Sequence, residues 1–121
     1  MLKIRVDQKN VFREEARRAF LIRLYNYLHE RVPGYFADLD YETALAHVDS
    51  LVTEAQELGF RTQNQIRRFT VAVTAATGHA GDYPPKWLSK IASRPHSSAP
   101  MRLLDIEDAL IHFVRSPGGK A

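Results

Sequence analysis

Apolar side chains recur along residues 7–32 with the spacing of one long amphipathic helix. A run at every fourth position is widened by three further apolar residues, and the stripe consists of Phe12, Ala16, Phe20, Leu24 and Leu28 with Val11, Ala19 and Tyr27. Asp7 is a candidate N-cap, Asn10 offers a later start, and Pro33 with Gly34 should stop the helix. We expect the shorter elements to pack against this helix.

A second stripe of helical spacing covers residues 41–58. Its apolar members are Tyr41, Ala44, Leu45, Val48, Leu51, Val52, Ala55 and Leu58. Asp38 and Asp40 are both candidate N-caps, and Gly59 stands where a helix end favours a residue with positive φ. The pattern predicts a second helix that ends near Leu58.

Capping residues also predict the third helix. Thr62 and Gln65 form a capping-box pattern that opens a helix over about residues 63–77, with Gly78 as its terminator. The β-branched residues within 70–74 are also compatible with a strand, but capping and length favour a helix.

Two more helices are predicted towards the C-terminus. Pro85 opens a short one that runs to Ala92, with Trp87 on its buried face. The last helix runs from about residue 99 or 100 to Arg115. Its expected apolar face consists of Leu103, Leu104, Ile106, Leu110, Phe113 and Val114.

The first six residues follow a different pattern, because Leu2, Ile4 and Val6 alternate with basic residues. With no evident partner strand, we expect a short N-terminal arm packed on the helices. The sequence therefore predicts one all-α domain over residues 1–115, a compact irregular bundle of four main helices plus one short helix, with a flexible tail at 116–121.

Composition is that of a globular protein, with 45% hydrophobic and 26% charged residues. The chain has no cysteine, which excludes disulfides, thiolate zinc sites and a cysteine nucleophile. Apolar runs are too short to span a bilayer, and the start lacks the pattern of a secretory signal. We expect a cytoplasmic protein with no membrane partner.

Charge is unevenly distributed along the chain. Residues 1–31 carry eight Lys or Arg against four acids, whereas residues 32–60 carry six acids and no Lys or Arg. This contrast predicts ion pairs between the first two helices, or an acidic face left open for a basic partner.

The motifs of common active sites are missing. No two of the five histidines lie three or four residues apart, although His29 and His47 could meet across two helices. Neighbouring carboxylates are explained as caps or as first-turn acids, and no nucleophile or phosphate-loop motif is present. We expect a protein without catalytic activity, metal or cofactor.

Two other surfaces invite a functional interpretation. Basic residues that could track phosphates lie on the first helix and at the start of the third: Lys9, Arg13, Arg17, Arg61, Arg67 and Arg68. The segment 83–87 clusters Tyr83 and Trp87 with two prolines, which fits either a core anchor or a protein-contact patch.

The order of features resembles a family of small bacterial proteins encoded beside type VI secretion genes, next to spike proteins, toxic effectors and immunity proteins. The matching residues are the segment 3–8, Phe20, Leu28, Val32 and Pro33, the hinge 55–62, Ile66 and Phe69 before Gly78, and Trp87 with Leu88. The loop at 78–83 is longer than in the family. The resemblance implies an accessory, adaptor or chaperone-like role and brings no catalytic residue.

We therefore expect a non-catalytic protein that binds a type VI secretion effector or spike protein. The expected contact residues are Asp49, Glu54 and Glu57 on the second helix, with Tyr83 and Trp87. One alternative is an immunity protein that occludes a cognate toxin. A further alternative is a small basic regulator that binds nucleic acid through the six basic residues named above.

Overall fold

The computed structural model describes the backbone of residues 2–81 and 84–115, and side chains from residue 13 onward. This part of the chain holds five helices and no strand. They are α1 (Leu2–Arg31), α2 (Tyr41–Glu57), α3 (Gln63–Ala80), α4 (Lys86–Ala92) and α5 (Ala99–Arg115). The all-α prediction is confirmed, while Tyr83 and the predicted tail at 116–121 lie outside the described residues.

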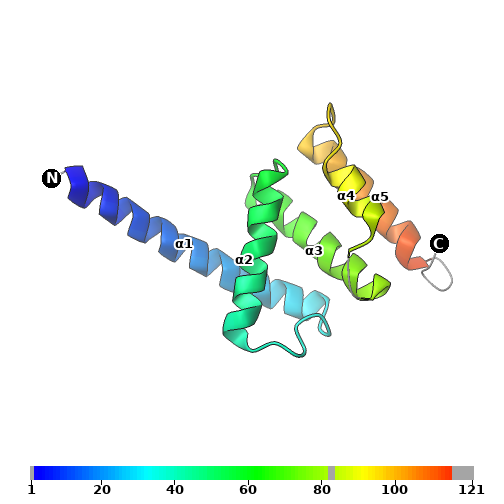
Figure 1. Ribbon diagram of the computed structural model, residues 1–121, viewed down its shortest axis with the longest axis horizontal. Helices are drawn as coiled ribbons and strands as arrows, with labels where there is room; N and C mark the ends of the chain where they lie inside the picture. Colours follow the sequence, from blue (N-terminus) through cyan, green and yellow to red (C-terminus); the bar gives the residue numbers. More distant parts are fainter. Residues whose placement is uncertain (1, 82–83, 116–121) are drawn as a thin grey trace.

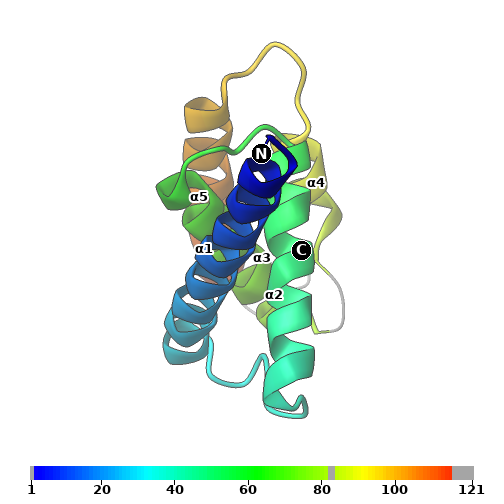
Figure 2. The same ribbon diagram turned by 90° about the vertical axis from the view of Figure 1, so that its left-hand side faces the viewer.

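The helices are arranged around α3 rather than around α1 (Figure 1). α3 packs against α1, α2 and α5, and the short α4 packs against α5. Figure 2 shows α1 and α2 side by side on one side of α3, with α5 on the other. The expectation that the shorter elements gather on the first helix is wrong, because α4 and α5 reach the core through α3.

The predicted N-terminal arm is instead the beginning of α1, which extends beyond the other helices in Figure 1. A helix satisfies its own backbone hydrogen bonds, whereas a lone extended segment cannot. Asp7 and Asn10 lie inside the helix, so neither is its N-cap.

The buried part of α1 begins later than the sequence pattern suggests. Leu24 and Leu28 are buried as predicted, and Phe20 is half-buried, but Ala16 and Ala19 are exposed. The side chains of Val11 and Phe12 lie outside the described part. Only the C-terminal half of α1 is therefore shown to contribute to the core.

Local capping signals locate the ends of α2 and the start of α3. The Asp40 carboxylate accepts a hydrogen bond of 2.7 Å from the Thr43 amide and is the N-cap of α2, whereas Asp38 is exposed and is not a cap. Gly59 ends α2 with a φ of 93°. The capping box of Thr62 and Gln65 is confirmed.

α3 continues to Ala80, three residues beyond its predicted end. Gly78 does not terminate it, and Gly81, with a φ of 121°, follows its last residue instead. The β-branched segment is helical, and its buried threonine hydroxyls donate to carbonyls one turn back, Thr74 to Thr70 at 2.9 Å and Thr70 to Arg67 at 2.9 Å. These bonds allow polar side chains to lie in the core.

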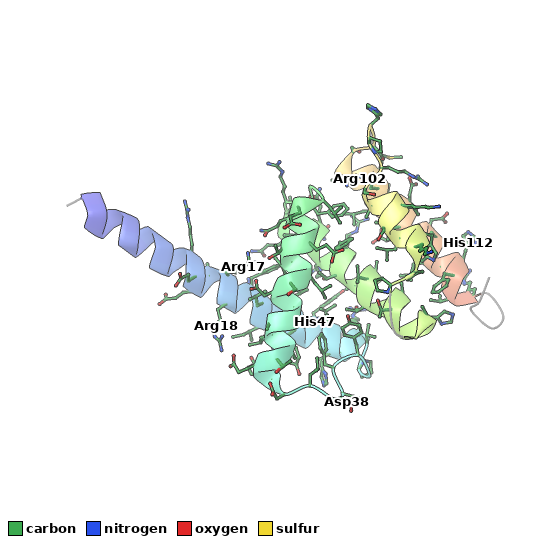
Figure 3. The ribbon with its side chains drawn as sticks, viewed as in Figure 1. Arg17, Arg18, Asp38, His47, Arg102 and His112 are labelled. Atoms are coloured by element: carbon green, nitrogen blue, oxygen red, sulfur yellow. The ribbon has the colours of Figure 1, made fainter. Side chains whose placement is uncertain are left out.

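Opposite charges join α1 to α2, as the charge distribution predicted. Arg17 pairs with Asp49 at 2.6 Å and Arg18 with Glu42 at 3.1 Å. Figure 3 shows both arginines on the part of α1 that lies near α2. Within the described ranges, every helix is too short or too polar to span a bilayer.

Candidate interaction surfaces

α5 carries four large apolar side chains that are exposed to solvent. They are Met101 (53% exposed), Leu104 (54%), Ile111 (46%) and Val114 (43%). Val114 follows the buried Leu103 by eleven residues, about three full turns, and so lies on the inner side near the end of the helix. The spacings of three and seven residues place the other three, Met101, Leu104 and Ile111, on the outer side. We call this surface the α5 outer face. It is the largest collection of exposed large apolar residues on any described helix.

The opposite side of α5 packs in the core. Leu103 and Ile106 are fully buried, and Phe113 contacts the ring of Trp87 at 5.5 Å between centroids. The sequence pattern also assigned Leu104 to this inner face, which is wrong, whereas Val114 lies on the inner side but stays exposed near the end of the helix. The helix has apolar residues on both sides, and sequence periodicity merges two such faces into one stripe.

A groove of about 840 Å³ lies beside the C-terminal end of α5. Val114 lines it, together with Leu39 and Asp38 from the segment between α1 and α2. Thr77 of α3 also lines it, and its buried hydroxyl has no hydrogen-bond partner among the described residues.

The wall of this groove holds a polar pair, Tyr35 and His47, whose hydroxyl oxygen and Nε2 are 2.7 Å apart. Burial raises the pKa of Tyr35, and the charge of Glu54 raises it further. Burial also lowers the pKa of His47. Both groups are therefore held in their neutral forms near pH 7, with the imidazole in a tilted contact with the ring of Tyr35 and an edge-on contact with that of Phe36.

The predicted acidic surface on α2 is only partly free. Asp49 is occupied by Arg17, whose guanidinium also donates to Thr53 at 3.1 Å. Glu54 and Glu57 are exposed, and neither forms an ion pair with a described residue. A partner that used Asp49 would have to displace Arg17.

Of the two predicted aromatic contact residues, Trp87 lies in the described part of the chain. Tyr83 lies outside the described residues. Trp87 of α4 is half-buried, and its ring contacts that of Phe113. Its Nε1 is buried with no hydrogen-bond partner among the described residues. This packing is that of a core anchor, the first of the two interpretations that its sequence context allowed.

The predicted basic residues do not form one continuous stripe. Arg17 and Arg68 are each held by a carboxylate, Arg68 by Glu107 with an Nε–Oε2 distance of 2.9 Å. Arg13 and Arg61 are exposed at separate places, and the side chain of Lys9 is outside the described part. Arg67 lies over the ring of Tyr27, 5.2 Å from its centroid.

The histidines make separate contacts. His29 stacks on Tyr25, and His79 contacts Phe113. In the part of the chain that the structure describes, no three histidine, aspartate or glutamate side chains are grouped as metal ligands would be.

The chain matches no protein-family model, no curated protein sequence and no solved structure. Its function must therefore be argued from its own surfaces.

Proposed function

We propose that this protein is a non-catalytic protein-binding accessory, an adaptor or chaperone-like factor for a type VI secretion effector or spike protein. The α5 outer face is the observation that supports protein binding. Contiguous exposed apolar side chains on a small domain are typical of interaction sites. The choice of partner rests on the sequence resemblance alone.

The α5 outer face has the dimensions of a helix-docking surface. A helix of 17 residues is about 25 Å long at about 1.5 Å per residue. Fully burying an exposed leucine or isoleucine contributes about 1.5–3 kcal/mol. Leu104 and Ile111 are therefore expected to be the main anchors of the contact, within an interface of about 1,200–2,000 Å².

Charged residues flank this face and would orient a partner. Asp108 lies between the apolar residues and His112 lies beside them. The Asp108 Oδ1 and His112 Nε2 atoms are 3.8 Å apart. On α2, the exposed Glu54 and Glu57 provide the acidic contribution that the sequence suggested. Such rim charges affect the association rate and specificity more than the affinity.

Co-expression tests this function. The effector and spike proteins of the source organism's type VI system would be produced singly with the tagged chain and co-purified at moderate salt. We expect one of them to be retained by the native chain and lost with Leu104→Glu/Ile111→Glu. The matched control, Ala16→Glu/Ala19→Glu, adds the same two charges to exposed positions of α1 and should retain the partner.

Two outcomes would contradict the proposal. One is that none of these proteins is retained by the folded native chain. The other is that the chain rescues cells from a co-produced toxin without changing its abundance or export, which is the behaviour of an immunity protein rather than of a loading factor.

A further inference from the structure

A second surface, chemically unlike the α5 outer face, lies between α1 and α3. Two adjoining pockets of about 370 and 310 Å³ share Tyr27, Asn64 and Arg67 as lining residues. Phe20 and Leu24 line the first of them. We call the two pockets together the Tyr27 groove.

Arginine side chains gather at this groove. The guanidinium carbons of Arg31 and Arg67 lie 4.7 and 5.2 Å from the centroid of the same Tyr27 ring. Arg23 lines the first pocket and is exposed. Arg31 lines neither pocket; it adjoins the groove through its contact with the Tyr27 ring and lines the groove of about 840 Å³. Cation–π contacts hold two of the three guanidinium groups in place without neutralising their charge.

These three arginines differ from others in the molecule. Four arginines form ion pairs with carboxylates: Arg17, Arg18, Arg68 and Arg94. Within the described part of the chain, Arg23, Arg31 and Arg67 have no carboxylate within ion-pair distance. The groove therefore carries positive charge that the rest of the described structure does not compensate.

The walls of the groove are partly apolar. Phe20 and Leu24 line its first pocket, and Val71 and Leu110 line its second. A bound segment would therefore be favoured if it combined carboxylates, for the arginines, with apolar side chains, for the walls. An amphipathic helix with acidic residues has both, and helix-in-groove binding is a common mode of peptide recognition.

We propose that the Tyr27 groove binds an acidic amphipathic segment of a partner protein. Carboxylates of that segment pair with Arg23, Arg31 and Arg67, and its apolar side chains contact Phe20 and Leu24. Glu107 of α5 lines the second pocket and lies one turn from both Leu104 and Ile111, so the groove adjoins the α5 outer face. The proposal does not depend on what binds at α5.

Apolar walls distinguish this partner from nucleic acid. Phosphate binding calls for cations along a backbone track and aromatic rings free to stack on bases. Here the ring of Tyr27 is already covered by two guanidinium groups, so it is not free to stack on a base.

A titration with defined probes tests the proposal. The probe is a labelled helical peptide of about 15 residues, long enough to form a helix, with leucine at every fourth position and glutamates beside each leucine. Its matched control replaces every glutamate with glutamine. A labelled thymidine oligonucleotide is the third probe. Binding is followed by fluorescence anisotropy and mapped by amide chemical shifts of the native chain.

We expect the acidic peptide to bind at least about tenfold more tightly than the glutamine peptide, since its carboxylates meet uncompensated charge. The amide signals of Tyr27, Asn64 and Arg67 should move. Arg67→Glu and, independently, Arg23→Glu should each weaken binding by about tenfold or more. Both positions are exposed, and circular dichroism would confirm folding. Arg13→Glu, an exposed arginine of α1 outside the groove, is the matched control and should bind as the native chain does.

Three results would overturn the proposal. The first is equal binding of the glutamate and glutamine peptides, or shifts located elsewhere. The second is a preference for the oligonucleotide at the same residues, which would make the groove a nucleic-acid site. The third is a native dimer, detected by sedimentation and abolished by Arg67→Glu, which would mean that a second copy of this chain fills the groove.

Discussion

At the scale of single residues, Arg102 of α5 connects the ends of two other helices. Its guanidinium donates to the carbonyl oxygens of Leu58 at 2.7 Å, Ser97 at 3.1 Å and Ala92, and it lies over the ring of Phe60. Leu58 and Ala92 stand at the C-terminal ends of α2 and α4, where helix dipoles favour a cation. Figure 3 shows Arg102 on α5 near these ends.

We predict that Arg102→Met lowers the free energy of unfolding by about 2–3 kcal/mol, because several charge-assisted hydrogen bonds are lost together. Urea denaturation would measure the loss. Arg94→Met is the control, since Arg94 makes only an exposed ion pair with Asp105, and it should cost less than about 1 kcal/mol. Equal losses in the two variants would show that Arg102 does not join the helix ends.

His47 should make stability depend on pH. Its pKa is lowered by burial, so between the folded pKa and the ordinary value of 6.5 the unfolded chain binds more protons than the folded one. The free energy of unfolding should therefore fall as pH drops below about 6.5. His47→Gln should flatten that part of the profile in a urea denaturation series. A profile that keeps its slope in His47→Gln would refute this assignment.

At the scale of elements, local signals predicted helix ends well. The caps Asp40 and Thr62 and the terminator Gly59 act within one helical turn, so the sequence contains all the information needed. The start of α1 was predicted wrongly because three alternating residues are too short a pattern to outweigh helix formation. The extension of α3 past Gly78 was also missed, since a glycine within a helix is unfavourable but tolerated.

Packing between elements was less predictable. The sequence contrast between a basic first helix and an acidic second helix correctly indicated that they pair, although not which residues would meet. The central place of α3 and the exposure of Leu104 and Val114 depend on which side of each helix its neighbours occupy. Of the sites, the Tyr27 groove was indicated only by Arg67 and Arg68, which were among the candidate basic residues and line it.

The ion pair between Arg17 and Asp49 tests how α1 is held on α2. A double-mutant cycle with Arg17→Ala and Asp49→Ala should give a coupling energy below about 1 kcal/mol that decreases with added salt, since both side chains are about 40% exposed. Urea denaturation of the native chain, the two single variants and the double variant would provide the four free energies of unfolding. A coupling of several kcal/mol that is insensitive to salt would mean that the pair is effectively buried.

At the scale of the whole molecule, the described helices present two surfaces of different chemistry. The α5 outer face is apolar, and the Tyr27 groove combines arginines with apolar walls. α3 contacts both α1 and α5 and so fixes the relative position of the two surfaces. In the proposed accessory role, the α5 outer face would contact one protein and the Tyr27 groove an acidic segment of a partner.

The absence of cysteine in the chain allows the central claim to be tested by labelling single introduced thiols. Leu104→Cys and Ala16→Cys each provide one exposed thiol, and the rate of maleimide modification would be measured for each variant alone and with the co-purified effector or spike protein. We predict that the partner slows labelling of Leu104→Cys at least about tenfold, because the α5 outer face becomes buried, and leaves Ala16→Cys unaffected. Unchanged labelling of Leu104→Cys within a stable complex would contradict binding through α5.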